Sequence, residues 1–220
     1  MLNSLLKRFL FLLGGYVIFV ILFILAARFF QNSGILFSFD RAVLNFFISL
    51  RHDWLTDIVL VITFLGDIKF VLPVSALLLI WFWLSKRIFH FSLLLVLTAV
   101  SAGLVFLLKD FFARIRPGIE LRLVSEDSFS FPSGHAMIAI AFWGVLAYLL
   151  SKNFSKQWQK TVVIAGGCAL IFAISTSRLY LGVHWPTDIL GSWILGGAWL
   201  AGLIWLSERQ FKEIITNKSE

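Results

Sequence analysis

Long apolar stretches separated by short polar segments dominate the chain from end to end. Runs of 15 to 19 residues without a charged side chain occur at Phe9–Ala27, Phe70–Leu84, Phe91–Leu108, Ala136–Leu150, Thr161–Thr176 and Ile189–Leu206. A membrane-spanning helix needs roughly 20 apolar residues, within a range of about 17–25. The pattern therefore predicts an all-α polytopic membrane protein with six transmembrane helices, in a single domain over residues 1–220.

The second and fourth runs are the shortest, with 15 residues each. They reach the required length only if the flanking residues Lys69, Ser133 and His135 lie within the membrane boundary. Such side chains are tolerated there when they extend toward the headgroups or line a cavity. The start of the second span is therefore the least defined boundary of the predicted fold.

A different pattern lies between the first two spans, where Phe39–Leu55 reads FDRAVLNFFISLRHDWL. Apolar residues recur three and four positions apart from Val43 to Ile48, and charged residues flank them. This spacing predicts an amphipathic helix lying on the outer membrane surface.

The composition excludes a soluble globular domain. Hydrophobic residues make up 60% of the chain and charged residues 14%, against usual shares of about 45–50% and about 25%. The one cysteine, Cys168, cannot form an internal disulfide and lies in an apolar run, where a packing role is expected. In so apolar a chain the net charge of +7 is expected at membrane edges rather than on nucleic acid.

The charges also predict an orientation. Six spans put both termini on one side, and that side would carry ten Lys and Arg but only three Asp and Glu, so the whole net charge of +7 falls there. Its basic residues are Lys7, Arg8, Lys86, Arg87, Lys152, Lys156, Lys160, Arg209, Lys212 and Lys218. The positive-inside rule then places both termini in the cytoplasm. The first run is longer than the roughly 7–15 apolar residues of a signal peptide, so we expect an uncleaved span.

Three polar clusters lie at span ends on the predicted outer side. The cluster KDFFARIRP ends the third span, FPSGH begins the fourth, and SRLYLGVHWPTD joins the fifth to the sixth. Short loops connect these spans, so the clusters can meet at one depth near the outer surface of the membrane.

Together the clusters would form an anion site. Lys109, Arg116 and Arg178 supply three cations, and the guanidinium fork matches phosphate oxygens. Ser133 and Gly134 open a helix whose free N–H groups and positive dipole end face the same side. Ser133 can cap this helix or donate to a ligand, and Gly134 leaves room for a ligand close to the backbone. A small anion with several charges, such as phosphate, fits best.

Two histidines, His135 and His184, stand beside the predicted anion. Imidazole suits proton transfer and nucleophilic attack near neutral pH. Asp188 follows His184 by four residues and can hold one ring nitrogen, which leaves the other free to attack phosphorus. A zinc site made of the same three residues is the weaker alternative, because the metal would lie among three cationic side chains.

Each feature also has a structural explanation when taken alone. Lys109 and Arg116 could anchor a span end, Pro132–Gly134 could be an ordinary helix start, and Arg178 could pair with Asp188. The conjunction of all three clusters at one membrane face favours a site. Other basic residues are not part of such a conjunction, and we expect them to be snorkelling or surface charges: Arg51, Lys69, Arg114 and Arg122.

The three clusters resemble the signature of the type-2 phosphatidic acid phosphatase (PAP2) superfamily, K-x6-RP, PSGH and SR-x5-H-x3-D. They match it completely, in order and with the family's spacing, as Lys109…Arg116-Pro117, Pro132-Ser133-Gly134-His135 and Ser177-Arg178…His184…Asp188. The six-span layout extends the resemblance over the whole chain. In length and pattern the chain is similar to the bacterial phosphatidylglycerophosphatase and undecaprenyl-pyrophosphate phosphatase branch.

The resemblance implies a metal-independent lipid phosphatase that needs no cofactor and acts through a phosphohistidine intermediate. His184 would be the nucleophile, Asp188 would orient and activate it, and His135 would protonate the leaving oxygen as general acid. The phosphate-binding residues would be Lys109, Arg116, Ser133, Gly134 and Arg178.

The expected partners are a membrane lipid phosphate and the bilayer, with no nucleic acid. The substrate could be phosphatidylglycerophosphate, undecaprenyl pyrophosphate or phosphatidate, and the expected location is the cell membrane with the active site on the extracytoplasmic side. A membrane transporter and a lipid-binding relative without activity are the alternatives. Transport sites usually lie near the bilayer midplane between repeats, whereas these charges crowd one end of the spans. The complete set of His135, His184 and Asp188 argues against an inactive relative.

Overall fold

The computed structural model describes residues 2–31 and 35–216, and the regular elements among these residues are all helices. The α-helices are α1 (Leu2–Gln31), α2 (Ile35–Ser49), α3 (Asp53–Phe64), α4 (Ile68–Leu84), α5 (Ile88–Phe112), α6 (Gly134–Ser151), α7 (Gln157–Tyr180) and α8 (Pro186–Thr216), and a short 3-10 helix, η1, covers Ile119–Leu121.

Six helical segments are long and apolar enough to cross a membrane, as the pattern of apolar runs predicts. Five of them lie in α1, α5, α6, α7 and α8. The remaining segment runs from Asp53 to Leu84 and contains both α3 and α4, joined by a turn at Leu65–Asp67. The two short predicted spans become helices of 17 residues in α4 and 18 residues in α6, at the lower edge of the range of about 17–25.

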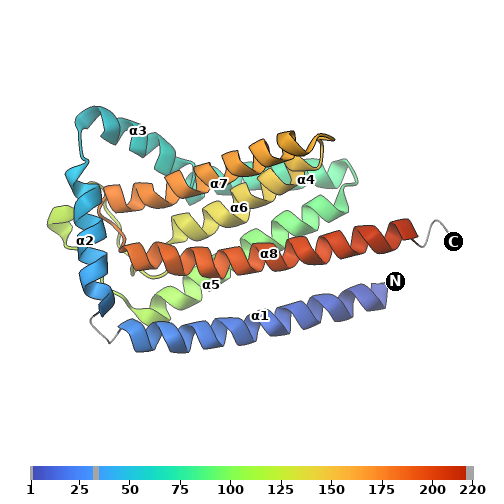
Figure 1. Cartoon of the computed structure of the whole chain (residues 1–220), viewed down its shortest axis with the longest axis horizontal. Coiled ribbons are helices and arrows are strands. Elements are labelled where there is room, and N and C mark those ends of the chain that lie inside the picture. Colours follow the sequence, from blue (N-terminus) through green and yellow to red (C-terminus); the bar gives the residue numbers. More distant parts are fainter. Residues whose placement is uncertain (1, 32–34, 217–220) are drawn as a thin grey trace.

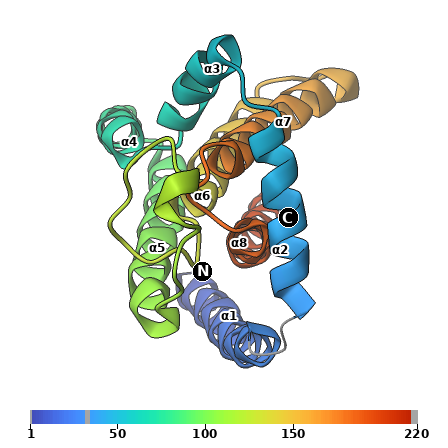
Figure 2. The same ribbon diagram turned by 90° about the vertical axis from the view of Figure 1, so that its left-hand side faces the viewer.

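The long helices run side by side as a bundle with α6 at its centre (Figures 1 and 2). α6 packs against α7, α5 and α8, and 61% of its span is buried against 11% for α1. α1 lies at the periphery and attaches to α8 through Tyr16, whose hydroxyl donates to the carbonyl of Leu195 at 2.9 Å. The Tyr16 ring also lies 4.6 Å from that of the buried Trp199.

Close packing in α8 depends on glycine at three positions. A Cβ atom would lie 2.5 Å from Phe131 at Gly191, 2.9 Å from Met137 at Gly196, and 3.1 Å from Leu12 at Gly202. These positions let α6, α1 and the loop before α6 approach the α8 backbone closely. Gly197 faces open space and has no such role.

α2 lies across one end of the bundle, nearly at right angles to the long helices (Figure 1). The predicted helix over Phe39–Leu55 is shorter at its C-terminal end, because α2 ends at Ser49 and the chain turns there into α3. Asp40 and Leu44 are buried at 0% and 1% exposure, and α2 packs on α7 and α8. Since the inner face of α2 covers protein, its contact with the membrane surface remains a prediction.

α1 begins and α8 ends at the opposite end of the bundle from α2 (Figure 1). This agrees with an even number of spans. Lys218 and Glu220, two of the charges counted for the predicted cytoplasmic side, lie outside the described residues.

Candidate active site

All three polar clusters lie at the α2 end of the bundle, where four long helices end or begin. Lys109 is in the last turn of α5, and α6 starts at Gly134. Arg178 is in the last turn of α7 and Asp188 in the first turn of α8, with His184 in the loop between them. The helix ends thus bring together residues that are up to 79 positions apart in the chain, from Lys109 to Asp188.

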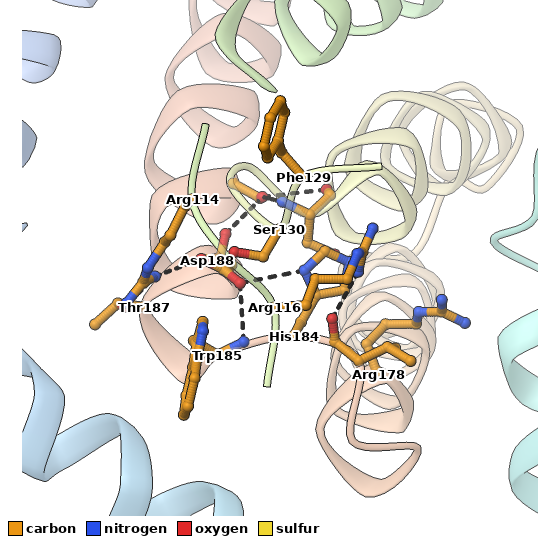
Figure 3. Close-up of polar contacts among 12 residues, drawn as sticks. Arg114, Arg116, Phe129, Ser130, Arg178, His184, Trp185, Thr187 and Asp188 are labelled. Carbon is orange, nitrogen blue, oxygen red and sulfur yellow. Dashed lines mark hydrogen bonds and ion pairs between the residues drawn. The ribbon is translucent and has the colours of Figure 1, made fainter. Parts of the chain in front are cut away.

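His184 and Asp188 form a buried pair at the start of α8 (Figure 3). Nδ1 of His184 lies 3.2 Å from Oδ2 of Asp188, and the side chains are 2% and 0% exposed. The same oxygen accepts the backbone N–H of Trp185 at 2.8 Å. Because a carboxylate only accepts, the proton of a neutral His184 ring is on Nδ1, and Nε2 keeps its lone pair.

Arg116 faces that second nitrogen. Its Nη1 lies 3.1 Å from Nε2 of His184 and donates to the carbonyl of Val183 at 2.6 Å. Burial lowers the pKa of Arg116 below its ordinary value, while the charges of Glu126 and Asp188 raise it. A guanidinium stays charged under these conditions, so a cation lies where negative charge would approach the ring.

Glu126 joins the two arginines of the predicted anion site. One of its oxygens lies 3.4 Å from Nη2 of Arg116, and the other pairs with Nη2 of Arg178. Nη1 of Arg178 donates to the hydroxyl of Thr63 at 2.8 Å. The suggested pair of Arg178 with Asp188 does not form, because Glu126 takes this guanidinium. The carboxylate of Glu126 therefore occupies donors that a bound phosphate needs.

Lys109 holds the loop that leads to α6. Its ammonium donates to the carbonyl of Phe129 and, at 3.1 Å, to the hydroxyl of Ser128. Arg116 donates to the same Ser128, through Nε to its carbonyl at 2.6 Å. The loop is thus fixed to two of the predicted phosphate-binding residues.

Three buried polar atoms of this region have no hydrogen-bond partner within residues 2–31 and 35–216: Ser133 Oγ, His135 Nε2 and Arg178 Nε. Ser133 is the N-cap residue of α6, yet its side chain makes no capping hydrogen bond. Of the two predicted roles of this hydroxyl, capping the helix and donating to a ligand, the first is therefore not observed. Buried polar groups are nearly always satisfied. Three unsatisfied groups, all in residues that the motifs single out, indicate a place for an anion with several oxygens.

His135 is the second residue of α6. Its Nε2 is 3.9 Å from an oxygen of Asp67, which caps α4 by accepting the N–H of Lys69. Asp67 is the carboxylate that can balance a proton on this ring.

The environment keeps the His184 ring neutral. Burial lowers its pKa well below the ordinary value, and the charges of Arg116, Arg178 and Lys109 lower it further. Only the neutral ring has a lone pair for attack on phosphorus. The site therefore stabilises the nucleophilic form of this side chain.

Two arginines that we expected at the surface are wrongly predicted. Arg114 is 16% exposed and pairs with Asp188 and Asp40. Arg51 donates to the carbonyls of Tyr180 and Leu121 at 2.7–2.8 Å. Both arginines lie just beyond helix ends and close to acceptors within the protein, so they donate to these acceptors instead of to water.

Glu126 and Asp67 were not singled out by the sequence either, because they stand in loops without periodicity. In the part of the chain that is described, no group of three His, Cys, Asp or Glu side chains is placed to hold a metal ion.

Comparisons with known proteins agree with this geometry. A sequence profile of the PAP2 superfamily matches residues 89–212. The chain is similar to phosphatidylglycerophosphatase B of Bacillus subtilis (strain 168), with 36% identity over 182 residues, which cover 81% of this chain and 87% of the relative. It is also similar to an undecaprenyl-diphosphatase of Sulfolobus acidocaldarius, with 34% identity over 60% of each chain.

A solved structure shares the fold. The crystal structure of a transmembrane PAP2-type phosphatidylglycerolphosphate phosphatase from Bacillus subtilis superposes with a TM-score of 0.75 at 30% identity, over 90% of this chain and 96% of that one.

Proposed function

The chain belongs to the PAP2 superfamily, and from this membership we propose that it removes a phosphate group from a membrane lipid through a covalent phosphohistidine on His184. The chain is a membrane lipid phosphatase, and the named intermediate and residue roles are the proposal. The observation that carries them is the set of three unpartnered buried atoms, Ser133 Oγ, His135 Nε2 and Arg178 Nε, together with the buried pair of His184 and Asp188.

In the first step, Nε2 of His184 attacks phosphorus and the bond between phosphorus and the lipid-side oxygen breaks. The electron pair of that bond goes to the leaving oxygen, which takes a proton from His135. The phosphorylated imidazole carries a positive charge with its proton on Nδ1, and Asp188 at 3.2 Å stabilises that charge.

In the second step, water attacks phosphorus and the bond to Nε2 breaks, so the electron pair returns to the ring. His135, now neutral, takes the proton of this water, and inorganic phosphate leaves. His135 gives a proton in the first step and takes one in the second, while His184 gains and then loses the phosphoryl group. Both histidines therefore return to their initial protonation states at the end of the cycle.

The transferred phosphoryl group needs donors around its three outer oxygens. Arg116 and Arg178 supply charged donors, the Ser133 hydroxyl a neutral one, and the first N–H groups of α6 at Gly134 the positive end of a helix. Lys109 completes the cationic set. The phosphate replaces the carboxylate of Glu126 on the two arginines, because a dianion attracts them more strongly than a monoanion.

The lipid tail has an apolar place beside this site. A cleft of about 270 Å³ lies between α4, α5 and α6, and Ile138 in its lining is one turn beyond His135 on α6. We propose that the tail stays in the bilayer along this cleft while the headgroup reaches His184. A photoreactive lipid phosphate that labels loop residues but neither Ile138 nor other cleft residues would oppose this route.

The active site is proposed to face the extracytoplasmic side, with both termini in the cytoplasm. The excess of basic residues at the opposite end supports this orientation. In a Cys168→Ala background, a membrane-impermeant thiol reagent should label Asp127→Cys but not Asn153→Cys in intact cells. The reverse labelling pattern would overturn the orientation.

The candidate substrates are the three lipid phosphates that the resemblance implies, and the similar relatives are named for two of them. Phosphatidylglycerophosphate carries a monoester and undecaprenyl pyrophosphate a diphosphate. Both present a terminal phosphate on an apolar tail, which is the feature the site can bind.

The direct test is phosphate release by the purified protein in detergent with EDTA, from phosphatidylglycerophosphate, undecaprenyl pyrophosphate and phosphatidate in parallel. We expect release that persists in EDTA and disappears in His184→Ala, and the ratio of rates identifies the substrate. Release that EDTA abolishes, or that His184→Ala retains, would refute the histidine mechanism. No release from a folded protein would favour the lipid-binding alternative.

A further inference from the structure

We propose that Arg114 and Asp40 are positioning residues for the His184–Asp188 pair, so that α2 contributes to the chemistry through a chain of contacts from Asp40 through Arg114 and Asp188 to His184, in which the charges alternate once His184 is phosphorylated. This inference rests on the proposed function of His184. It concerns two residues that the motifs do not specify: Arg114 is at an unspecified position of K-x6-RP, and Asp40 lies before the segment that the family profile matches, residues 89–212.

Arg114 bridges two buried carboxylates, and Figure 3 shows its contact with one of them, Asp188. Its Nη1 donates to Oδ1 of Asp188 and its Nη2 to Oδ2 of Asp40, while both acids are 0% exposed. Nη1 also donates to the hydroxyl of Thr187 at 2.8 Å. A single cation thus compensates two negative charges that water does not reach.

The acceptors of Asp188 are divided between its neighbours. Oδ2 accepts the Trp185 N–H and the Nδ1 proton of His184, and Oδ1 accepts Arg114. The side chain of Ser130 is a further donor to this carboxylate. Arg114 is the charged donor of this group, so it favours the ionised form of Asp188 and fixes the plane in which Oδ2 meets His184.

Asp40 fixes Arg114 from the opposite side. Its Oδ1 accepts the backbone N–H of Thr187 at 2.9 Å and its Oδ2 the Thr187 hydroxyl at 2.8 Å. Thr187 directly precedes Asp188 in the first turn of α8, where N–H groups lack helical partners. The Asp40 side chain therefore caps α8 from another helix, and it holds both Arg114 and the backbone that carries Asp188.

The alternation of charge has a consequence for the reaction. When His184 becomes a phosphorylated cation, Asp188 must be an anion at that moment. A buried carboxylate without a counter-charge favours the protonated form, and the charge of Arg114 opposes that tendency. Asp40 in turn balances Arg114 while Asp188 is engaged with His184.

The test compares Arg114→Gln, Arg114→Lys and Asp40→Asn with the unmodified protein, each also in an Asp188→Asn background, for phosphate release in detergent. We expect Arg114→Gln to lower kcat by about 10–100-fold and KM to change little, as for partners that orient a reacting group. Asp40→Asn should lower kcat less. In the Asp188→Asn background Arg114→Gln should have almost no further effect, because both changes break one chain of contacts.

The matched control is Arg41→Gln, since Arg41 is exposed on α2 next to Asp40 and contacts only the ring of Phe37 among the contacts described for it. Its activity should equal that of the unmodified protein. If Arg114→Gln does not fold, Arg114→Lys tests the proposal instead. Because one ammonium cannot bridge both acids, kcat should still fall while the variant keeps its fold.

A second readout does not depend on turnover. In protein with 15N-labelled histidine, the Nδ1 proton of His184 should show a hydrogen bond that Arg114→Gln weakens as Asp188→Asn does. An unchanged Nδ1 signal together with an unchanged kcat would overturn the positioning role, as would fully additive effects in the double variants. If the unmodified protein releases no phosphate, the proposed function fails, and the Nδ1 signal still decides whether Arg114 positions the pair.

Discussion

Nδ1 of His184 lies 3.2 Å from Oδ2 of Asp188, across the start of α8, and both side chains are buried. This contact sets the tautomer of the ring and turns Nε2 toward Arg116, 3.1 Å away. In the proposed mechanism, the attacking atom and the cation that attracts its target are thus fixed before any substrate arrives. Fixed dipoles and charges of this kind need no rearrangement during reaction.

The pH dependence follows from the low pKa of His184. Burial and the nearby cations Arg116, Arg178 and Lys109 depress it, so the ring stays neutral as the pH falls through the ordinary value of about 6.5. We therefore expect kcat/KM to persist below that pH, once the ionisation of the substrate phosphate is allowed for. Phosphate release from mildly acidic to mildly basic pH measures this. An acid limb near the ordinary histidine value would contradict it.

Arg178→Lys separates charge from geometry. The guanidinium donates to Thr63 at 2.8 Å and to Glu126, with its Nε left over. An ammonium keeps the charge but cannot serve Thr63 and a phosphate at once, so kcat/KM should fall by about 10²–10³-fold. Arg122→Lys is the control, because Arg122 donates to the Pro117 carbonyl and no contact between Arg122 and His184 is among those described. Equal activity of both variants would show that charge alone suffices.

Glu126→Gln tests the competition between carboxylate and phosphate. Glu126 pairs with Arg116 and Arg178, so removing its charge should strengthen the binding of orthovanadate, a phosphate mimic. We expect an inhibition constant lower by about 5-fold, as for a competing contact worth about 1 kcal/mol. Asp127→Asn, on the exposed neighbour, should leave the constant unchanged. Weaker inhibition of Glu126→Gln would mean that the carboxylate helps binding.

Gly182→Ala should damage the loop that carries His184. Gly182 has a φ of +74°, and a Cβ there would lie 2.0 Å from the carbonyl oxygen of Leu121. Backbone strain and the clash should cost at least about 2 kcal/mol, lowering the melting temperature in detergent by roughly 4–8 °C. Gly197→Ala faces open space and should not lower it. A Gly182→Ala protein with unchanged melting and activity would refute this reading of the turn.

Much of the site could be predicted because helix ends bring distant residues together. Once residues 91–108, 136–150, 161–176 and 189–206 are assigned as spans, Lys109, His135, Arg178 and Asp188 must lie at one end of the bundle. Apolar runs of this length leave few other arrangements.

The remaining contacts depend on long-range side-chain pairing that no local pattern reveals. Asp40 has the spacing of a solvent-facing residue in an amphipathic helix, yet α2 turns it onto α8. Arg114 sits two residues from Arg116 and was expected at the surface, because its acceptor Asp40 is 74 positions away. Glu126 lies in a loop without periodicity. The contacts of these three residues follow only from the three-dimensional packing of the chain.

The most direct measurement is chemical trapping of the intermediate. The protein is mixed with a lipid phosphate that carries a 32P label at its terminal phosphate, quenched in alkaline detergent, and digested for mapping by mass spectrometry. We expect an alkali-stable, acid-labile label on His184 that is absent from His184→Asn. A label on another residue, or turnover without any labelled protein at the shortest times, would contradict attack by His184.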